Sequence, residues 1–338
     1  MKTTNNLADL MMTSKELMQR VNVLLKAHGK KGLKEAQKAM SEEKPTHETL
    51  AEALGYFMNE VWFDFLHPAL LSLASEAVGG KPDETTRMGA AFVLLAGGAD
   101  VHDDIIDQST TKEGKATVFG KYGKDIAILA GDALLFKGLY LLHDAVRLLP
   151  DKERQQILEG VRQAFASINS AEAKEASLRG KIDIPGDKYL DIIKMKVAVA
   201  EATTRIGAII GKGTPQQIDV LSEYGRVFGI LNTVRDEYID VFDEVELKNR
   251  AEKECLPLPI LVTFEDPKKK TEILELIKQP TTKETMEKIL DLTMDSLETQ
   301  NLTKDIKALM RQELQLISVI QNCRLELELL LNATLIDL

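Results

Sequence analysis

Hydrophobic residues along the chain recur mainly at the spacing of an α-helix. Between Leu10 and Ala27 the apolar positions lie mostly three, four or seven residues apart, which places them on one helical face. Short apolar runs such as VLLAG and AILAG lie inside longer helical patterns and do not indicate strands. The same periodicity predicts helices over residues 48–66, 68–80, 83–107, 123–149, 151–178, 187–211 and 215–243, with further helices between 268 and 338. The pattern therefore predicts an all-α fold.

Several stretches interrupt this pattern. Residues 30–44 are charged and interrupted by glycine, which predicts a surface turn and a short helix. Residues 108–115 predict a polar loop, residues 244–254 predict little helix, and a further turn is expected near 301–302. No repeat and no glycine- and serine-rich linker divides the rest of the chain. We therefore expect a helical N-terminal extension over residues 1–45 and a single all-α domain over residues 46–338.

The composition narrows the function classes. The 338 residues include 43 basic and 53 acidic side chains, so the chain as a whole has no basic excess, and we do not expect nucleic acid as a partner. The polar N-terminus does not resemble a signal peptide, and no run of about 18 residues is free of charge, so we expect no transmembrane segment. Two cysteines, Cys255 and Cys323, are too few for a disulfide framework and fit a reducing, cytoplasmic compartment.

The most distinctive polar feature is a cluster of acids in the segment HDDIID. Asp103 and Asp107 lie four residues apart and therefore on one helical face, with Asp104 beside them. Three carboxylates at this spacing repel one another unless a cation or water offsets their charge. Mg²⁺ prefers carboxylate oxygens together with the phosphate oxygens of a substrate. Taken alone, the cluster fits a metal site and a solvated helix end equally well.

A second set of oxygen-bearing side chains lies on another predicted helix. Asn232, Asp236 and Asp240 recur every four residues in the segment NTVRDEYID, and apolar residues such as Phe228 flank them. Two acidic stripes on two mostly buried helices favour a paired metal site in a helix bundle over two unrelated solvated faces.

The surroundings of both stripes resemble the trans polyprenyl diphosphate synthase family. The segment HDDIIDQSTTKEGKATVFGKYGKDIAILAGDALLF is similar to its first aspartate-rich region, and RDEYID is similar to its second. Supporting stretches are HPALLSLASEAVGG, EYGRVFGILNTVRDEYID and YLDIIKMKVAVAEATTRIGAIIG, so the resemblance runs from about Glu48 to Pro259. It implies the class I isoprenoid (terpene) synthase fold, a bundle of antiparallel helices around a deep central cavity.

The resemblance also implies roles for individual residues. The metal site would hold about three Mg²⁺ ions through Asp103, Asp104, Asp107, Asn232, Asp236 and Asp240, of which Asp103, Asp104, Asp107 and Asp236 would be catalytic. The diphosphate of the substrate would contact Lys112, Lys196 and Arg235. The cavity would be lined by Phe65, Gly98, Ala99 and Phe228. The small Gly98 and Ala99 leave room for a long prenyl chain, or simply permit close helix packing. Members of the family are usually dimeric, so a homodimer is expected.

The chain departs from the family where isopentenyl diphosphate would bind. The family stretch GGKRLRP corresponds here to WFDFLHP, with Asp64, Phe65 and His67 in place of three cations. Ala96 stands where a histidine or glutamine is usual, and Glu113 replaces an arginine after the first motif. These changes predict a pocket with too little positive charge for a second diphosphate.

Three functions remain open on this basis. The first is Mg²⁺-dependent ionisation of an allylic prenyl diphosphate, of C15–C20 or longer, with the cation quenched by cyclisation, by elimination or by an acceptor other than isopentenyl diphosphate. The second is ordinary chain elongation with isopentenyl diphosphate, as in geranylgeranyl or polyprenyl diphosphate synthases. The third is a non-catalytic subunit of a prenyl synthase heteromer.

Overall fold

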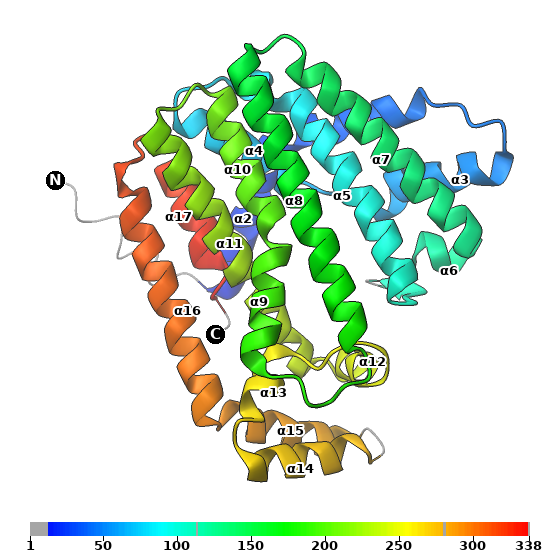
Figure 1. Cartoon of the computed structure of the whole chain (residues 1–338), viewed down its shortest axis with the longest axis vertical. Helices are drawn as coiled ribbons and strands as arrows, with labels where there is room; N and C mark the ends of the chain where they lie inside the picture. The colour runs from blue at the N-terminus through cyan, green and yellow to red at the C-terminus, as the bar shows by residue number, and fades with distance from the viewer. Residues whose placement is uncertain (1–12, 113, 280–281, 337–338) are drawn as a thin grey trace. The chain divides into compact units, whose positions relative to one another are not determined.

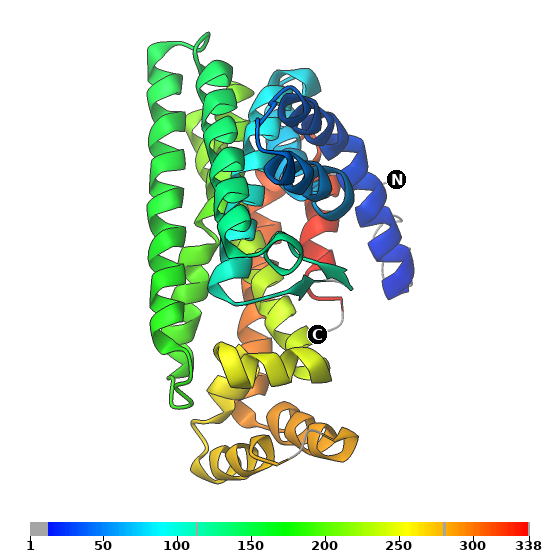
Figure 2. The same ribbon diagram turned by 90° about the vertical axis from the view of Figure 1, so that its right-hand side faces the viewer.

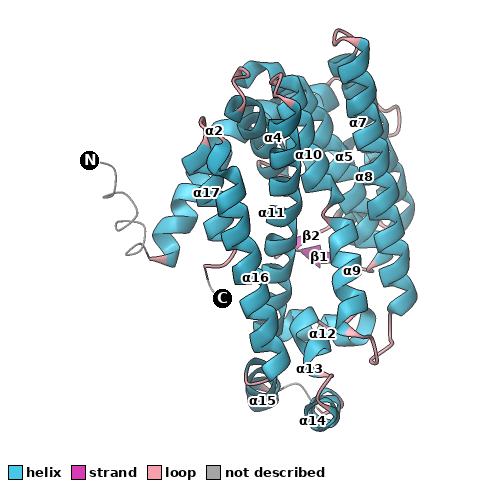
Figure 3. Cartoon of the chain, turned by 60° about the vertical axis from the view of Figure 1, so that its left-hand side comes forward, coloured by secondary structure: helices cyan, strands magenta, loops and turns pink. Residues whose placement is uncertain are grey.

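The computed structural model describes residues 13–112, 114–279 and 282–336, and this part of the chain is almost entirely helical (Figure 1). Within it, the strands are limited to β1 (Thr111–Lys112) and β2 (Lys115–Ala116), which pair antiparallel at the end of the predicted polar loop (Figure 3). The expected all-α fold is confirmed.

The described residues divide into two compact units. Unit 1 comprises residues 13–160, 203–222 and 320–326, and unit 2 comprises residues 161–202, 223–319 and 327–336. The division passes through four helices: α8 (Asp151–Leu178), α10 (Ala198–Ile210), α11 (Pro215–Phe242) and α17 (Arg324–Ala333). Each unit is described by itself.

Unit 1 is built around two antiparallel neighbours, α5 (Thr86–Ile106) and α7 (Lys124–Val146) (Figure 1). Gly98 permits their close approach, because a Cβ added to it would lie 2.7 Å from Leu135 Cγ. The other elements of unit 1 are α2 (Ser14–Ser41), α3 (Glu48–Tyr56), the π-helix η1 (Phe57–Val61), α4 (Leu66–Ala77), the 3₁₀-helix η2 (Pro82–Thr85) and α6 (Val118–Tyr122). Figure 2 shows the β1–β2 hairpin beside α6.

Helix α2 covers most of the segment assigned to an N-terminal extension. It packs against α4 and α5, and residues 1–12 lie outside the described part. The predicted turn and short helix over 30–44 are wrong, because α2 continues to Ser41 without a break. Its glycines serve helix packing: a Cβ on Gly29 would lie 2.3 Å from the carbonyl oxygen of Phe65, and one on Gly32 would lie 2.7 Å from Pro68 Cβ.

Unit 2 contains most of the C-terminal helices. They are α9 (Gly186–Lys196), α12 (Glu244–Lys253), α13 (Leu258–Thr263), α14 (Pro267–Ile277), α15 (Lys283–Met294), α16 (Leu297–Leu316), the 3₁₀-helix η3 (Ile317–Val319) and the larger part of α17, from Leu327 on. Helix α13 packs against α9 and α16.

Three sequence-based boundaries in this part of the chain are wrong. Helix α12 occupies the segment expected to hold little helix, because Asp243 caps it by accepting the backbone N–H groups of Val245 (2.9 Å) and Glu246 (3.0 Å). Helix α16 runs through 301–302 without a turn, since Leu302 packs into the core. The helix predicted over 187–211 is broken at Val197 into α9 and α10.

Helix α7 is the one described helix that is long and apolar enough to cross a membrane by length and composition. Core helices of globular proteins meet the same criteria, and α7 packs against α5 in unit 1. Its outer face nevertheless carries exposed Leu129, Phe136 and Tyr140, seven and four residues apart along the helix.

Candidate functional site

The first acidic stripe lies at the C-terminal end of α5, in unit 1. Asp103 and Asp104 stand in its last turn, and Asp107 is its C-cap. Burial raises the pKa of Asp104 to about 7, and the charges of Asp100 and Asp103 act in the same direction. Asp103 and Asp104 lie within α5, as the spacing predicted, whereas Asp107 directly follows the helix, and Asp104 is buried rather than solvated.

Asp100 belongs to this stripe, although the sequence analysis missed it. Its carboxylate pairs with Lys112 of β1. Burial lowers the pKa of Lys112, but the charge of Asp100 and its hydrogen bond outweigh burial, and the pKa is raised overall. The missed signal was the spacing, because Asp100 stands four residues before Asp104 and three before Asp103.

The hairpin that carries Lys112 is tied to α5 and α3 by hydrogen bonds that backbone carbonyl oxygens accept. The N–H of Ser109 donates to the carbonyl oxygen of Asp104 (2.8 Å), and the Thr117 hydroxyl donates to the carbonyl oxygen of Ser109 (2.7 Å). The Tyr56 hydroxyl holds the other strand by donating to the carbonyl oxygen of Ala116 (2.8 Å). These bonds keep the ammonium group of Lys112 beside the acids of α5.

The second acidic stripe lies on the part of α11 that belongs to unit 2. Asn232 Nδ2 donates to Asp236 Oδ2 at 3.1 Å, which fixes two members of the stripe relative to each other. Burial raises the pKa of Asp236 to about 6, although Arg235 lowers it. Burial also raises the pKa of Asp240 to about 7, against the opposing charge of Arg250.

Arg250 of α12 is the residue of this region that the sequence analysis missed. Its guanidinium contacts Asp240 Oδ2 at 2.6 Å and Glu237 Oε2 at 3.0 Å, and only 8% of its side chain is exposed. The predicted metal ligand Asp240 is therefore also the partner of a buried cation. No sequence signal marked Arg250, because its segment was expected to hold little helix.

The predicted diphosphate ligands occupy well-defined places within their units. Lys196, in the last turn of α9, pairs with Glu175 and lies 3.2 Å from Glu172, both on α8. Arg235 lies on α11 between the members of the second stripe. Lys196 is therefore held by two carboxylates that a diphosphate would have to replace.

The four residues expected to line a cavity have different surroundings. Gly98 faces α7, which supports the helix-packing explanation of its size, whereas Ala99 beside it is partly exposed. Phe228 is buried and its ring stacks on Tyr224, with centroids 6.2 Å apart. Phe65 is the half-buried N-cap residue of α4.

Asp64 and His67 form a pair at the start of α4. Asp64 Oδ2 lies 2.8 Å from His67 Nδ1, and its Oδ1 accepts the backbone N–H groups of Leu66 and His67. Burial lowers the pKa of His67, but Asp64 outweighs it and raises the pKa overall. The Asp64 charge is thus balanced locally. Glu113, the other acid at a family cation position, lies outside the described residues.

The donor chemistry of both stripes fits Mg²⁺. Among the described residues, no group of three or more His, Cys, Asp or Glu side chains converges closely enough to hold a metal ion. Mg²⁺ normally takes only one or two carboxylates and completes its shell with water and substrate phosphate. The carboxyls of Asp104, Asp236 and Asp240, whose pKa values are raised, are the groups whose charge a divalent cation would stabilise. Because the stripes belong to different units, their facing one another stays a prediction.

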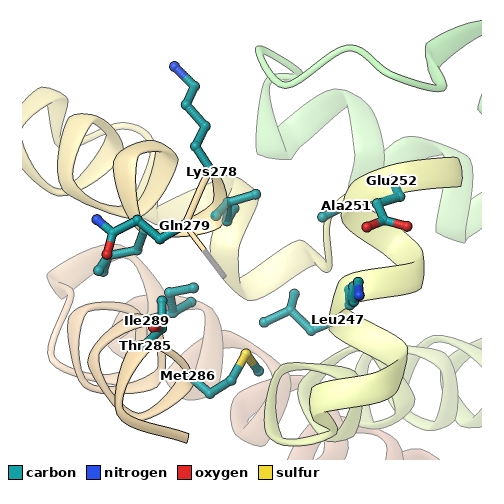
Figure 4. A pocket seen from close by; sticks show the side chains of 11 residues that line it. Leu247, Ala251, Glu252, Lys278, Gln279, Thr285, Met286 and Ile289 are labelled. Atoms are coloured by element: carbon teal, nitrogen blue, oxygen red, sulfur yellow. The ribbon is translucent and has the colours of Figure 1, made fainter. Parts of the chain in front are cut away.

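A pocket of about 470 Å³ lies elsewhere, in the C-terminal part of unit 2 (Figure 4). Leu247 of α12 and Met286 of α15 point into it, whereas the Lys278 side chain points away. A second pocket, between α14 and α15, shares Leu276 and Gln279 with the first. Neither pocket includes a predicted site residue.

Comparisons with known proteins agree with these features. The model of the polyprenyl synthetase family matches residues 65–293. A short chain isoprenyl diphosphate synthase of Methanothermobacter thermautotrophicus is 34% identical over 183 residues, which are 54% of this chain and 55% of that protein. A geranylgeranyl diphosphate synthase of Sulfolobus acidocaldarius is 34% identical over 184 residues, 54% of this chain and 56% of that protein. The chain thus spans about half the length of the curated relatives it matches.

The fold has close counterparts among solved structures. The geranylgeranyl pyrophosphate synthetase of Pyrococcus horikoshii superposes with a TM-score of 0.84 at 24% identity, over 94% of this chain and 98% of that one. A polyprenyl synthetase of Streptomyces coelicolor gives a TM-score of 0.80 at 17% identity, over 93% and 99% of the two chains. At this level of identity the likeness establishes the fold and leaves the chemistry to the site residues.

Proposed function

The chain belongs to the polyprenyl synthetase family, and from this premise we propose that it is a Mg²⁺-dependent prenyltransferase that extends an allylic prenyl diphosphate with isopentenyl diphosphate. The observation that carries the proposal is that α5 and α11, both within the family match, each bear a stripe of oxygen ligands with strongly raised carboxyl pKa values. The curated relatives named above support elongation over the other two hypotheses.

Each side chain has a definite part in this proposal. Asp103, Asp104 and Asp107, with Asn232, Asp236 and Asp240, would hold about three Mg²⁺ ions, which supply positive charge to the departing diphosphate. Lys112 would exchange Asp100 for a diphosphate oxygen, and Lys196 would exchange Glu175 for another. Arg235 is the third cation assigned to this diphosphate.

A second function is favoured by one specific observation. Asp64 and His67 neutralise each other where the family resemblance predicts cations for isopentenyl diphosphate. A region without net positive charge holds a second diphosphate poorly, because each charge-assisted contact contributes roughly 1.5–3 kcal/mol. Ionisation of the allylic diphosphate, followed by cyclisation, elimination or transfer to another acceptor, is therefore the alternative to elongation.

One incubation separates these functions. The protein is mixed with Mg²⁺ and C10, C15 or C20 allylic diphosphates, with and without isopentenyl diphosphate, and the products are identified by mass spectrometry. Chain elongation is supported if longer prenyl products form only when isopentenyl diphosphate is present. Consumption of the allylic substrate alone supports the second function. Consumption in neither case contradicts both and leaves the non-catalytic subunit.

We also propose that the protein is a cytoplasmic homodimer. The exposed Leu129, Phe136 and Tyr140 of α7 form a stripe at coiled-coil spacing, which the same helix of a second copy can cover. Both cysteines are free, as expected in a reducing compartment. Phe136→Glu should halve the mass measured by light scattering, whereas Val23→Glu, at an exposed site on α2, should not.

A further inference from the structure

Arg250 makes more contacts than a buried ion pair requires. Its Nη1 donates to Asp240 Oδ2 (2.6 Å), and its Nη2 donates to both oxygens of Glu237 (3.0 and 3.1 Å) and to the Tyr189 hydroxyl (2.9 Å). Its Nε donates to the carbonyl oxygen of Cys255 (2.7 Å). All three kinds of guanidinium nitrogen are used, so the orientation of the side chain is fixed in every direction.

The charges around Arg250 do not balance within this group. Glu237, Asp240 and Glu254, the last at 3.7 Å, present three carboxylates to one guanidinium. Glu237, which is as buried as Arg250, already matches its charge. Asp240 is therefore held in place by Arg250 without being neutralised, and its Oδ1 accepts no hydrogen bond from the described residues. Such an arrangement suits a carboxylate that receives a second cation.

The contacts of Arg250 also connect it to Lys196, which is predicted to bind the diphosphate. The Tyr189 hydroxyl, which accepts from Arg250, donates to Glu175 Oε1 (2.7 Å), and Glu175 pairs with Lys196. One chain of interactions therefore joins Asp240 on α11 to Lys196 on α9, through α12 and α8. Every member belongs to unit 2.

We propose that Arg250 is a positioning residue: it fixes the carboxylate of Asp240 for a divalent cation and, through Tyr189 and Glu175, keeps Asp240 and Lys196 in register as one preassembled half of the site. The inference rests on the proposed function, because it takes Asp240 as a metal ligand. It goes further in assigning a role to Arg250, which neither the acidic stripe nor the family motifs include.

The test measures metal binding without turnover. Free Mn²⁺ is followed by electron paramagnetic resonance during titration of the full-length, metal-free protein and its Arg250→Lys variant. Lysine keeps the charge but loses the fork, so Arg250→Lys should weaken Mn²⁺ binding by roughly 10- to 100-fold, the usual effect of losing a group that orients a metal ligand. The matched control is Arg226→Lys, whose guanidinium pairs with Glu223 on α11 and touches neither stripe; its Mn²⁺ affinity should stay within about twofold.

A double-mutant cycle separates positioning from a general structural role. If Arg250 acts through Asp240, then Arg250→Lys should have little further effect in an Asp240→Asn background, whereas independent roles would give additive losses. Unchanged or tighter Mn²⁺ binding by folded Arg250→Lys, or additivity in the cycle, overturns the inference. If circular dichroism shows that Arg250→Lys is unfolded, Tyr189→Phe replaces it. This variant removes only the linking hydroxyl and should still weaken binding severalfold, and wild-type binding would overturn the inference.

The proposed function fails in a different way. A wild-type protein that consumes no allylic diphosphate in the presence of Mg²⁺ contradicts the prenyltransferase proposal, whatever the Mn²⁺ titrations show. Normal turnover by the wild type together with an Arg250→Lys variant that binds Mn²⁺ normally contradicts only the role of Arg250.

Discussion

The two acidic stripes each have a cation of their own, but they hold it in opposite ways. In unit 1, Lys112 comes from a short hairpin, its side chain is 51% exposed, and its ion pair is with Asp100. In unit 2, Arg250 comes from a capped helix, is 8% exposed, and contacts Asp240, Glu237 and Tyr189 together. An exposed ammonium can change partners at little cost, whereas a buried and fully bonded guanidinium cannot.

Under the proposed function, this difference gives the two cations different tasks. Lys112 is suited to leave Asp100 and follow a diphosphate, since water can take its place during the exchange. Arg250 is suited to keep Asp240 still while other groups move. The predictions below test that division from the largest expected effect to the smallest.

Removing one acid from either stripe should have the largest effect. We expect Asp103→Ala and Asp236→Ala each to lower diphosphate release by at least about 100-fold, because each removes stabilisation of the developing negative charge. The melting temperature should be nearly unchanged, since neither side chain is needed for packing and the removal of each relieves its repulsion with neighbouring carboxylates. Asp83→Asn, on an exposed ion pair with Lys31, is the control. If the alanine variant of one stripe keeps full activity per folded molecule, that stripe does not take part in the reaction.

Replacing Arg250 or Lys112 by a neutral residue should lower the free energy of unfolding by different amounts. Arg250→Met leaves buried carboxylates without their partner and should lower the free energy of unfolding by about 3–5 kcal/mol. Lys112→Met should cost about 1 kcal/mol or less, because its ion pair is half exposed. Urea denaturation of both variants, without metal, provides the measurement. Equal losses would mean that burial does not distinguish the two cations.

The pH dependence of the unfolding free energy should reveal the carboxyls with raised pKa values in both stripes. The folded-state pKa values of Asp104 and Asp240, about 7, and of Asp236, about 6, lie above the unfolded value of 3.8. Their stabilising contribution is therefore complete below the unfolded pKa and is lost as pH rises through 6–7. In the metal-free protein, Asp104→Asn and Asp240→Asn should each reduce the fall in unfolding free energy between pH 5 and 8.

Magnesium should act on the same groups with the opposite pH dependence. Its binding requires the ionised carboxylates, so the increase in melting temperature that Mg²⁺ causes should be small at pH 5.5 and larger at pH 8. Differential scanning fluorimetry at the two pH values gives the comparison. A melting temperature that Mg²⁺ raises equally at both would contradict the assignment of these carboxyls to the metal.

Exchanging lysine for arginine at the exposed cation should have the smallest effect. Lys112→Arg keeps the charge and adds a bidentate fork for phosphate oxygens. We expect a decrease of a few-fold in the KM for the allylic diphosphate, a nearly unchanged kcat, and no measurable change in stability. Initial rates at varied substrate concentration test this. A large fall in kcat would instead give Lys112 a fixed positioning role like that of Arg250.

Local patterns in the chain were sufficient for much of the fold. The periodicity over 151–178 predicted α8 with the bounds that the structure has, because a 3.6-residue repeat depends only on neighbouring residues. The spacing likewise placed Asp103, Asp236 and Asp240 correctly on their helices, whereas Asp107 caps the end of α5. The breaks between helices were predicted less well. Gly32 suggested a turn, but it lies inside a helix at a contact with another helix. The charged residues 244–254 suggested little helix, but Asp243 caps a helix there.

The sequence by itself determined the all-α class, the two stripes of oxygen-bearing side chains and the family, since each depends on residue types at short, fixed spacing. Tertiary structure alone decided which charges meet. Arg250 reaches Tyr189 across 61 positions of the chain, and Lys112 meets Asp100 only because a hairpin folds back onto α5. Asp64 and His67 are only three residues apart, but the sequence did not show that they pair. The start of α4 brings their side chains into contact. Periodicity records which face of a helix is apolar, but the partner of a polar group is set by the packing of whole elements.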